Sequence, residues 1–168
     1  MSSSVATDTR LEAICRCFDH IFFETYRTRL TGGHSEPFYK APSTTHDGEI
    51  QFTRDFFRSA LHETAHWCVA GDERLSKNDW GYWYSPDGRN AEQQQAFFKM
   101  EIKPQALEWI FCDACREPFS ISADNLNGST EGQSDFEKEV LAQKESYLQH
   151  GLPDRAAKWV QGLISTFS

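Results

Sequence analysis

The sequence has few positively charged residues. Its 168 residues include 17 Lys and Arg against 25 Asp and Glu, which gives a net charge of −8. Nucleic-acid binders neutralise phosphates with clustered Lys and Arg, and no such cluster is visible. We therefore expect no nucleic-acid partner. A partner or substrate that carries positive charge is compatible with this acidic balance.

Long apolar runs are also missing. No run approaches the roughly 20 residues that a membrane span requires. The pattern of an export signal, a basic stretch followed by an apolar one, is not visible either. The five cysteines are an odd number, and without an export signal we expect them to be reduced thiols. Together these absences predict a cytoplasmic protein with no membrane partner.

Aromatic side chains, in contrast, are abundant. The sequence contains 13 Phe and 5 Trp and is 39% hydrophobic, which predicts a packed core rather than disorder. The length fits one domain. Residues 1–8 are small and polar, so we expect them to be flexible. Residues 9–168 are expected to form a single domain.

The spacing of apolar residues predicts mainly helices. We expect helices at 9–30, 54–71, 91–115, 135–149 and 153–166. The first should begin near residue 8 or 9 and stop at the glycine pair 32–33, and Pro104 should kink or divide the third. We expect short strands at 38–40, 49–53, 79–90 and 118–126, the last two running into turns. The predicted fold class is therefore α+β, mostly helical with a few short strands.

The helix predicted at 54–71 contains the motif HETAH, formed by His62, Glu63 and His66. Residues four apart differ by about 40° in direction around a helix, so the two imidazoles share a face and can converge on one divalent ion. Glu63 points to the side, where proteases with this motif place their general base. The alternative is a core helix with incidental histidines. We favour a metal site because the motif falls on an independently predicted helix.

Two histidines rarely suffice to hold a metal, so we expect a third ligand. Glu101 lies among apolar neighbours, where a lone carboxylate is costly to bury without a cation. Glu108 follows seven residues later and shares a face with Glu101 if the helix is not interrupted. We predict His62, His66 and Glu101 as ligands, with Glu108 as the alternative third one. Such a set supports zinc hydrolysis, with the motif's glutamate as base, or oxygen activation with Fe(II).

Other chemically active residues are weaker candidates. Cys112 and Cys115 form a single CxxC, and inward-facing helix positions explain both. Arg89 lies in a tight turn and could hold an anionic group near the site. Asp124 follows a predicted strand, where it is either a cap or a substrate contact.

Four stretches, in this order, carry a resemblance to a known family: ALHETAHWCVAG, DWGYWYSPDGRNAEQQ, MEIKPQALEWIF and PFSISADNL. Together they resemble the elongation factor P hydroxylase family of bacteria. The resemblance covers residues 36–126, more than half of the sequence. One departure is Thr64, where an apolar residue is expected in this family.

The resemblance implies a bacterial cytoplasmic enzyme related to the non-haem iron oxygenases. Its substrates would be O₂ and elongation factor P carrying a β-lysylated lysine, to which it would add a hydroxyl group. It implies Fe(II) as the metal, held by His62, His66 and Glu101, and Zn or Mn could take its place in the purified protein. Glu63 would then act as a proton relay or an orienting group.

Residues that wall the substrate pocket are predicted from the aromatic and polar side chains nearby. They are Trp67, Trp80, Tyr82, Trp83, Arg89, Glu108 and Asp124. Two other functions remain open at this point. The first is a small zinc metalloprotease with Glu63 as the base. The second is a degenerate module that binds the translation factor without catalysis.

Overall fold

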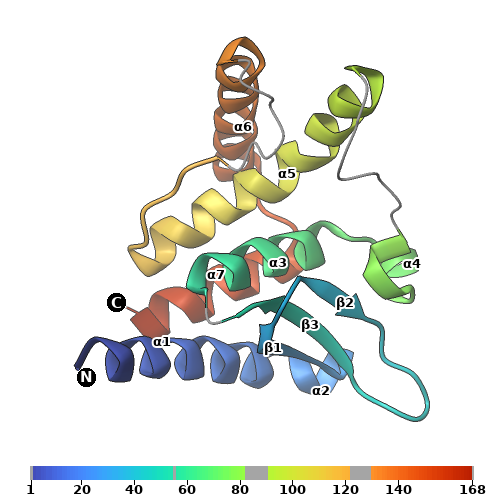
Figure 1. Ribbon diagram of the computed structural model, residues 1–168, viewed down its shortest axis with the longest axis vertical. Coiled ribbons are helices and arrows are strands. Elements are labelled where there is room, and N and C mark those ends of the chain that lie inside the picture. The colour runs from blue at the N-terminus through green and yellow to red at the C-terminus, as the bar shows by residue number, and fades with distance from the viewer. Residues whose placement is uncertain (1, 55, 82–90, 122–129, 168) are drawn as a thin grey trace.

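A computed structural model describes residues 2–54, 56–81, 91–121 and 130–167, and Figure 1 shows their arrangement. The helices are α1 (Ser2–Phe18), α2 (Glu24–Tyr26), α3 (Phe57–Val69), α4 (Asp72–Leu75), α5 (Ala91–Cys115), α6 (Thr130–His150) and α7 (Asp154–Phe167), together with the π-helix η1 (Asp19–Phe23) and the 3₁₀-helix η2 (Asn78–Gly81). The strands are β1 (Thr28–His34), β2 (Phe38–Lys40) and β3 (Gly48–Thr53). The predicted α+β class, mostly helical with a few short strands, is confirmed.

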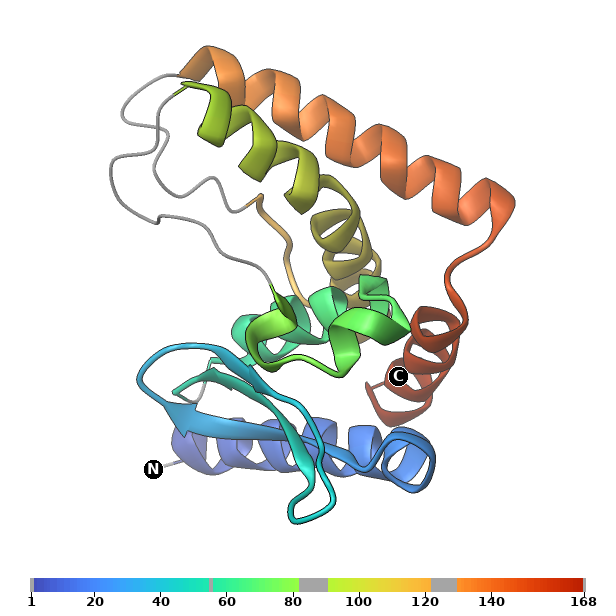
Figure 2. The same cartoon turned by 90° about the vertical axis from the view of Figure 1, so that its right-hand side faces the viewer.

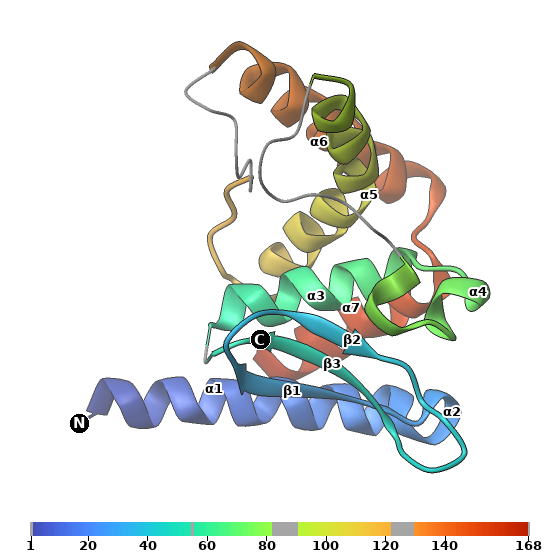
Figure 3. The same ribbon diagram turned by 45° about the vertical axis from the view of Figure 1, so that its right-hand side comes forward.

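The three strands form one small sheet in the order β1-β3-β2. β1 runs parallel to β3, and β2 runs antiparallel to it. Residues of the central strand alternate between buried and half-buried, with Ile50 and Phe52 in the core, as the two-residue period of a strand requires. Figure 3 shows the sheet beside α1 on one side and α3 on the other.

Large aromatic rings form the centre of the core. Phe18 and Phe22 come from the first helical segment, and Trp67 and Trp159 come from α3 and α7. The ring of Trp67 lies 5.0 Å from that of Phe18 and 4.8 Å from that of Phe22, edge to face. Such pairs stabilise a core beyond the area they bury. These rings fix α3 against α1 and α7, so the helix that carries the HETAH motif is firmly held.

The other half of the molecule is built on α5. This helix packs against α3, α6 and α7, and Figure 2 shows α6 running alongside it, away from the sheet. Among the described residues no helix is both long and apolar enough to cross a membrane. Since α5 lies directly on α3, side chains on their facing surfaces can meet.

Several predicted elements differ from those observed. The first helix begins at Ser2, earlier than expected, and the helical segment ends at Tyr26 rather than at the glycine pair 32–33. Arg27 has a left-handed backbone (φ 51°) that stops the helix, and the residues after it pair with β3. Residues 79–81 belong to η2 and residues 118–121 form no strand, so those two strand predictions are wrong there. The remainders, 82–90 and 122–126, lie outside the described residues, and the flexibility expected for residues 1–8 stays a prediction.

The other predicted elements are confirmed. The strands at 38–40 and 49–53 correspond to β2 and β3, and the helices predicted at 54–71, 91–115, 135–149 and 153–166 correspond to α3, α5, α6 and α7. Gly71 lies just beyond α3 with an ordinary extended backbone (φ −77°), because a new short helix begins at the next residue.

We expect Thr64→Val to lower the free energy of unfolding by about 1–3 kcal/mol, because a buried donor loses its acceptor. The Thr64 hydroxyl is fully buried; it accepts a hydrogen bond from Trp159 Nε1 (3.0 Å) and donates one to the carbonyl of Leu61 (3.0 Å). Urea denaturation of both proteins measures the difference. Thr44→Val, at an exposed threonine, is the matched control, and an equal loss in the two variants would contradict this role for the hydroxyl.

Candidate metal centre

The candidate centre lies where α3 faces α5. α5 runs without a break through Pro104, so of the two predicted effects of this proline, a kink or a division of the helix, the division is wrong. Glu101 and Glu108 are therefore two turns apart on one face. α3 presents His62 and His66 on the opposing surface. His62, the earlier residue of α3, contacts Glu108, the later residue of α5, while His66 contacts Glu101. The two helices therefore run in opposite directions (Figure 1).

Three of these side chains bring their ligand atoms together. Glu101 Oε2 lies 2.9 Å from His66 Nε2, and Glu101 Oε1 lies 3.8 Å from His62 Nε2. All three ligand atoms lie within 4.8 Å of one another. Ligands that share one ion at bond lengths of about 2.0–2.2 Å lie about 3–4 Å apart. Small side-chain movements would therefore let all three reach one ion.

The environment of Glu101 fits a cation. Its carboxylate is only 6% exposed, and Gln105 Nε2 donates a hydrogen bond to Oε1 at 3.2 Å. Burial raises the pKa of Glu101, but the charge and hydrogen bond of His66, with smaller contributions from His62 and Gln105, lower it to about 2. A buried, charged carboxylate together with the two imidazoles beside it is a suitable donor set for a divalent transition metal.

Glu108 has a different role from Glu101. Its Oε1 accepts a hydrogen bond of 2.7 Å from His62 Nδ1, on the side of the ring that faces away from Glu101. Its Oε2 accepts bonds from Arg58 Nη2 (2.6 Å) and Nε (3.2 Å). With Nδ1 occupied in this way, Nε2 is the ring nitrogen of His62 left to face the metal position. Since Glu108 is 1% exposed, it contacts protein groups and not an open pocket, which corrects its expected place in the pocket wall.

These contacts also set the charge of His62. Burial lowers the pKa of this ring, but the hydrogen bond and charge of Glu108, followed by the charges of Glu101 and Glu63, raise it to about 10. The metal-free centre therefore holds a proton on His62. A divalent ion takes the place of such protons when it binds.

Glu63 lies beside the cluster and remains a candidate for proton transfer. It is 8% exposed. Burial raises its pKa, the charges of His62 and His66 lower it, and the charge of Glu101 raises it again, so that the net direction is upward. It is outside the group of three that could hold a metal. Its role in proton transfer stays a prediction.

The structure describes only some of the residues predicted to wall the pocket. Trp67 has no exposed surface and packs in the aromatic core, because it points to the opposite layer from the histidines, so it does not line a pocket. Trp80 lies in η2. The remaining predicted positions, Tyr82, Trp83, Arg89 and Asp124, lie outside the described residues, so their part in the pocket stays a prediction.

Within the part of the chain that the structure describes, the cysteines belong to no group that could hold a metal. All five are free thiols. Cys112 and Cys115 are buried on the inner face of α5, and burial is the main cause that raises the pKa of each to about 12. A thiol of this kind is a weak nucleophile and a weak metal ligand. The interpretation of the CxxC as two inward helix positions fits this environment.

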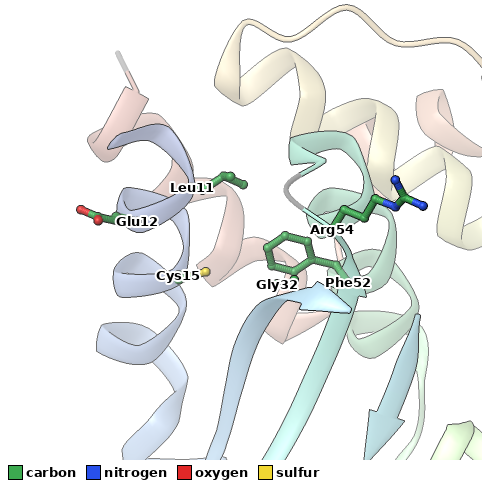
Figure 4. A pocket seen from close by; sticks show the side chains of 7 residues that line it. Leu11, Glu12, Cys15, Gly32, Phe52 and Arg54 are labelled. Atoms are coloured by element: carbon green, nitrogen blue, oxygen red, sulfur yellow. The ribbon is translucent and has the colours of Figure 1, made fainter. Parts of the chain in front are cut away.

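A separate hollow lies between α1 and the ends of β1 and β3 (Figure 4). Leu11, Cys15 and Phe52 give it an apolar lining. Figure 4 shows the charged ends of Glu12 and Arg54 directed away from each other, at opposite sides of the hollow. None of the candidate metal ligands lines it, so it is distinct from the centre between α3 and α5.

Arg58 contacts the site through Glu108, and the sequence interpretation missed it. It lies one turn before His62, so positions 58, 62 and 66 share one face of α3. A basic side chain in line with two histidines, opposite two glutamates seven residues apart, is the signal that could have identified it. Reading that signal required the knowledge that α3 and α5 pack face to face.

The fold and the site together define a small α+β protein in which two histidines and one carboxylate are placed so that they could hold a transition metal. A family model described as elongation factor P hydroxylase matches residues 17–168. The chain is also 46% identical over 160 residues to the elongation factor P lysine hydroxylase of Haemophilus influenzae, covering 95% of this chain and 90% of that protein. The chain belongs to the elongation factor P hydroxylase family.

Proposed function

We propose that this protein hydroxylates a lysine of elongation factor P, and that the lysine is the one already carrying a β-lysyl group. Membership of the elongation factor P hydroxylase family is the observation that carries this function. The cluster of His62, His66 and Glu101 supports it, because hydroxylation of an unactivated carbon needs a redox-active metal and these residues could hold one. Since the substrate is a translation factor, we also propose that the protein acts in the cytoplasm.

Fe(II) is the metal we propose, and when bound it would supply the activation of O₂. His62 and His66 would hold it through Nε2, and Glu101 through its carboxylate. Glu108 would keep the His62 ring in place through the bond of Oε1 to Nδ1. Three protein ligands leave further positions on such a metal free for small molecules.

Glu63 is the residue we propose for proton transfer. Its carboxyl lies next to His62 in the chain and is mostly buried, so it can accept a proton inside the site and return it without exchange with bulk water. The net charge of −8 favours the approach of a substrate whose reacting side chain carries amino groups. The alternative function of a zinc metalloprotease is not favoured, because the family to which the chain belongs is described as a hydroxylase.

Intact-mass analysis of β-lysylated elongation factor P tests the function directly. We expect a gain of one oxygen atom after incubation with the iron-loaded protein, a reductant and O₂. Fragmentation should place that oxygen on the modified lysine. Unmodified elongation factor P serves as the matched substrate control. An unchanged mass under conditions in which the protein retains iron would contradict the proposal, and cleavage of the factor would favour the peptidase alternative.

A further inference from the structure

We infer that Arg58 is a positioning residue, which links the segment 118–121 to the orientation of the metal ligand His62. The inference rests on the metal centre of the proposed function and assigns a role to a residue outside its ligand set. Arg58 projects from α3 one turn before His62 and lies between Glu108 on one side and residues 118–121 on the other.

On the side of the metal centre, Arg58 holds Glu108. Two guanidinium nitrogens donate to Glu108 Oε2, at 2.6 and 3.2 Å, while Oε1 accepts from His62 Nδ1 at 2.7 Å. The carboxylate of Glu108 is 2% exposed and the Arg58 side chain 29% exposed. Each carboxylate oxygen therefore has its own partner. The orientation of His62 depends on that of Glu108, and the orientation of Glu108 depends on Arg58.

On the other side, the same guanidinium holds the chain that follows α5. Arg58 Nη1 donates to the carbonyl of Pro118 at 3.1 Å, and Nη2 donates to the carbonyl of Ser120 at 3.0 Å. The Arg58 guanidinium carbon lies 5.2 Å from the centre of the Phe119 ring, which stacks on Trp109 at 4.8 Å. Residues 118–121 form no helix or strand, so these contacts are an important part of what fixes them.

The guanidinium of Arg58 thus binds both Glu108 and the segment 118–121. Only a fork of several N–H donors can bind one carboxylate and two carbonyls at once, and arginine is the side chain with that geometry. If the segment moves, the guanidinium moves with it, and the support of His62 through Glu108 changes. Coupling between two sites is reciprocal. A metal ion that fixes His62 should therefore also steady residues 118–121.

Two measurements with Co²⁺ as the probe test this link. The first is the affinity for Co²⁺, followed by the visible absorption of the bound ion. The second is amide hydrogen exchange at residues 119–121 with and without Co²⁺. In Arg58→Ala we expect Co²⁺ to bind about 10–100-fold more weakly, the range for partners that orient a ligand. We also expect the Co²⁺-dependent protection of residues 119–121, present in the unchanged protein, to disappear.

Two further variants separate positioning from a general structural effect. Arg10→Ala is the matched control, because Arg10 bonds Glu117 at 3.1 Å beside the same segment and otherwise lies over the rings of Phe57 and Phe167. It should leave Co²⁺ affinity and the metal-dependent protection unchanged. Arg58→Lys keeps the charge and loses the fork, so it should restore part of the affinity and little of the protection.

The outcomes are distinct. A folded Arg58→Ala protein with unchanged affinity and unchanged protection overturns the inference. If Arg58→Ala does not fold, Arg58→Lys decides, and unchanged affinity and protection in that variant also overturn the inference. His62→Ala tests whether His62 is a metal ligand at all. If this variant also binds Co²⁺ normally, the proposed ligand set is wrong, whatever the role of Arg58. Neither measurement depends on hydroxylation, so the proposed function is tested separately.

Discussion

Replacing His66 by alanine is expected to reduce hydroxylation of β-lysylated elongation factor P by more than about 100-fold, since loss of a partner that only orients a ligand already costs about 10–100-fold. The ring nitrogen of His66 lies 2.9 Å from Glu101 and belongs to the cluster that could hold the metal. Without it, one histidine and one carboxylate remain on the metal, too few to fix an ion in this site. The measurement is the fraction of the factor that gains one oxygen, at equal enzyme and iron concentrations.

The control for this variant is another histidine. His20 is exposed and lies on η1, which packs against α1, β1 and α7. We expect His20→Ala to keep its activity and its bound iron. Iron content, measured on both proteins after purification without oxygen, shows whether activity and metal are lost together. A His66→Ala protein that hydroxylates at the normal rate would mean that the reaction takes place elsewhere in the chain.

Local geometry explains why the position of the two histidines on one face of α3 could be predicted from the sequence. Their spacing of four residues on a helix fixes their relative direction, whatever the rest of the chain does. Glu101 could be predicted for a different reason, the cost of burying a lone carboxylate among apolar neighbours. In the structure it is buried and lies between the two rings.

Contacts between distant segments explain what could not be predicted. The first residues of β1, 28–30, were expected to end the first helix, because the apolar stripe before them is helical. Their strand partner β3 lies 20 residues further along the chain, and no local pattern points to it. Trp67 was expected in the pocket wall and is instead buried in the aromatic core, since a single sequence does not say which layer each face of α3 covers. The true contacts of Glu108, with His62 and Arg58, depend on how α5 is aligned along α3, and no local pattern encodes that alignment.

A bound divalent ion is expected to stabilise the folded protein strongly. At a free metal concentration 100 times the dissociation constant, binding to the folded state alone adds about 2.7 kcal/mol to the free energy of unfolding. For a chain of this length each kcal/mol raises the melting temperature by about 2–4 °C, so a rise of about 5–10 °C should follow. Thermal melting with Fe(II) under anaerobic conditions, and again with a chelator, measures the shift.

Glu101→Gln is the variant that assigns this stabilisation to the proposed ligands. Glutamine has nearly the same shape and can still contact Gln105, but it lacks the charge that His66 and His62 surround in the native protein. We therefore expect most of the metal-dependent rise to vanish, while Glu145→Gln, at an exposed glutamate of α6, keeps it. A full rise in Glu101→Gln would exclude Glu101 as the third ligand. Glu108 would then be the group to test, although its two oxygens are already engaged by His62 and Arg58. The comparison of the two glutamates thus decides which turn of α5 holds the metal.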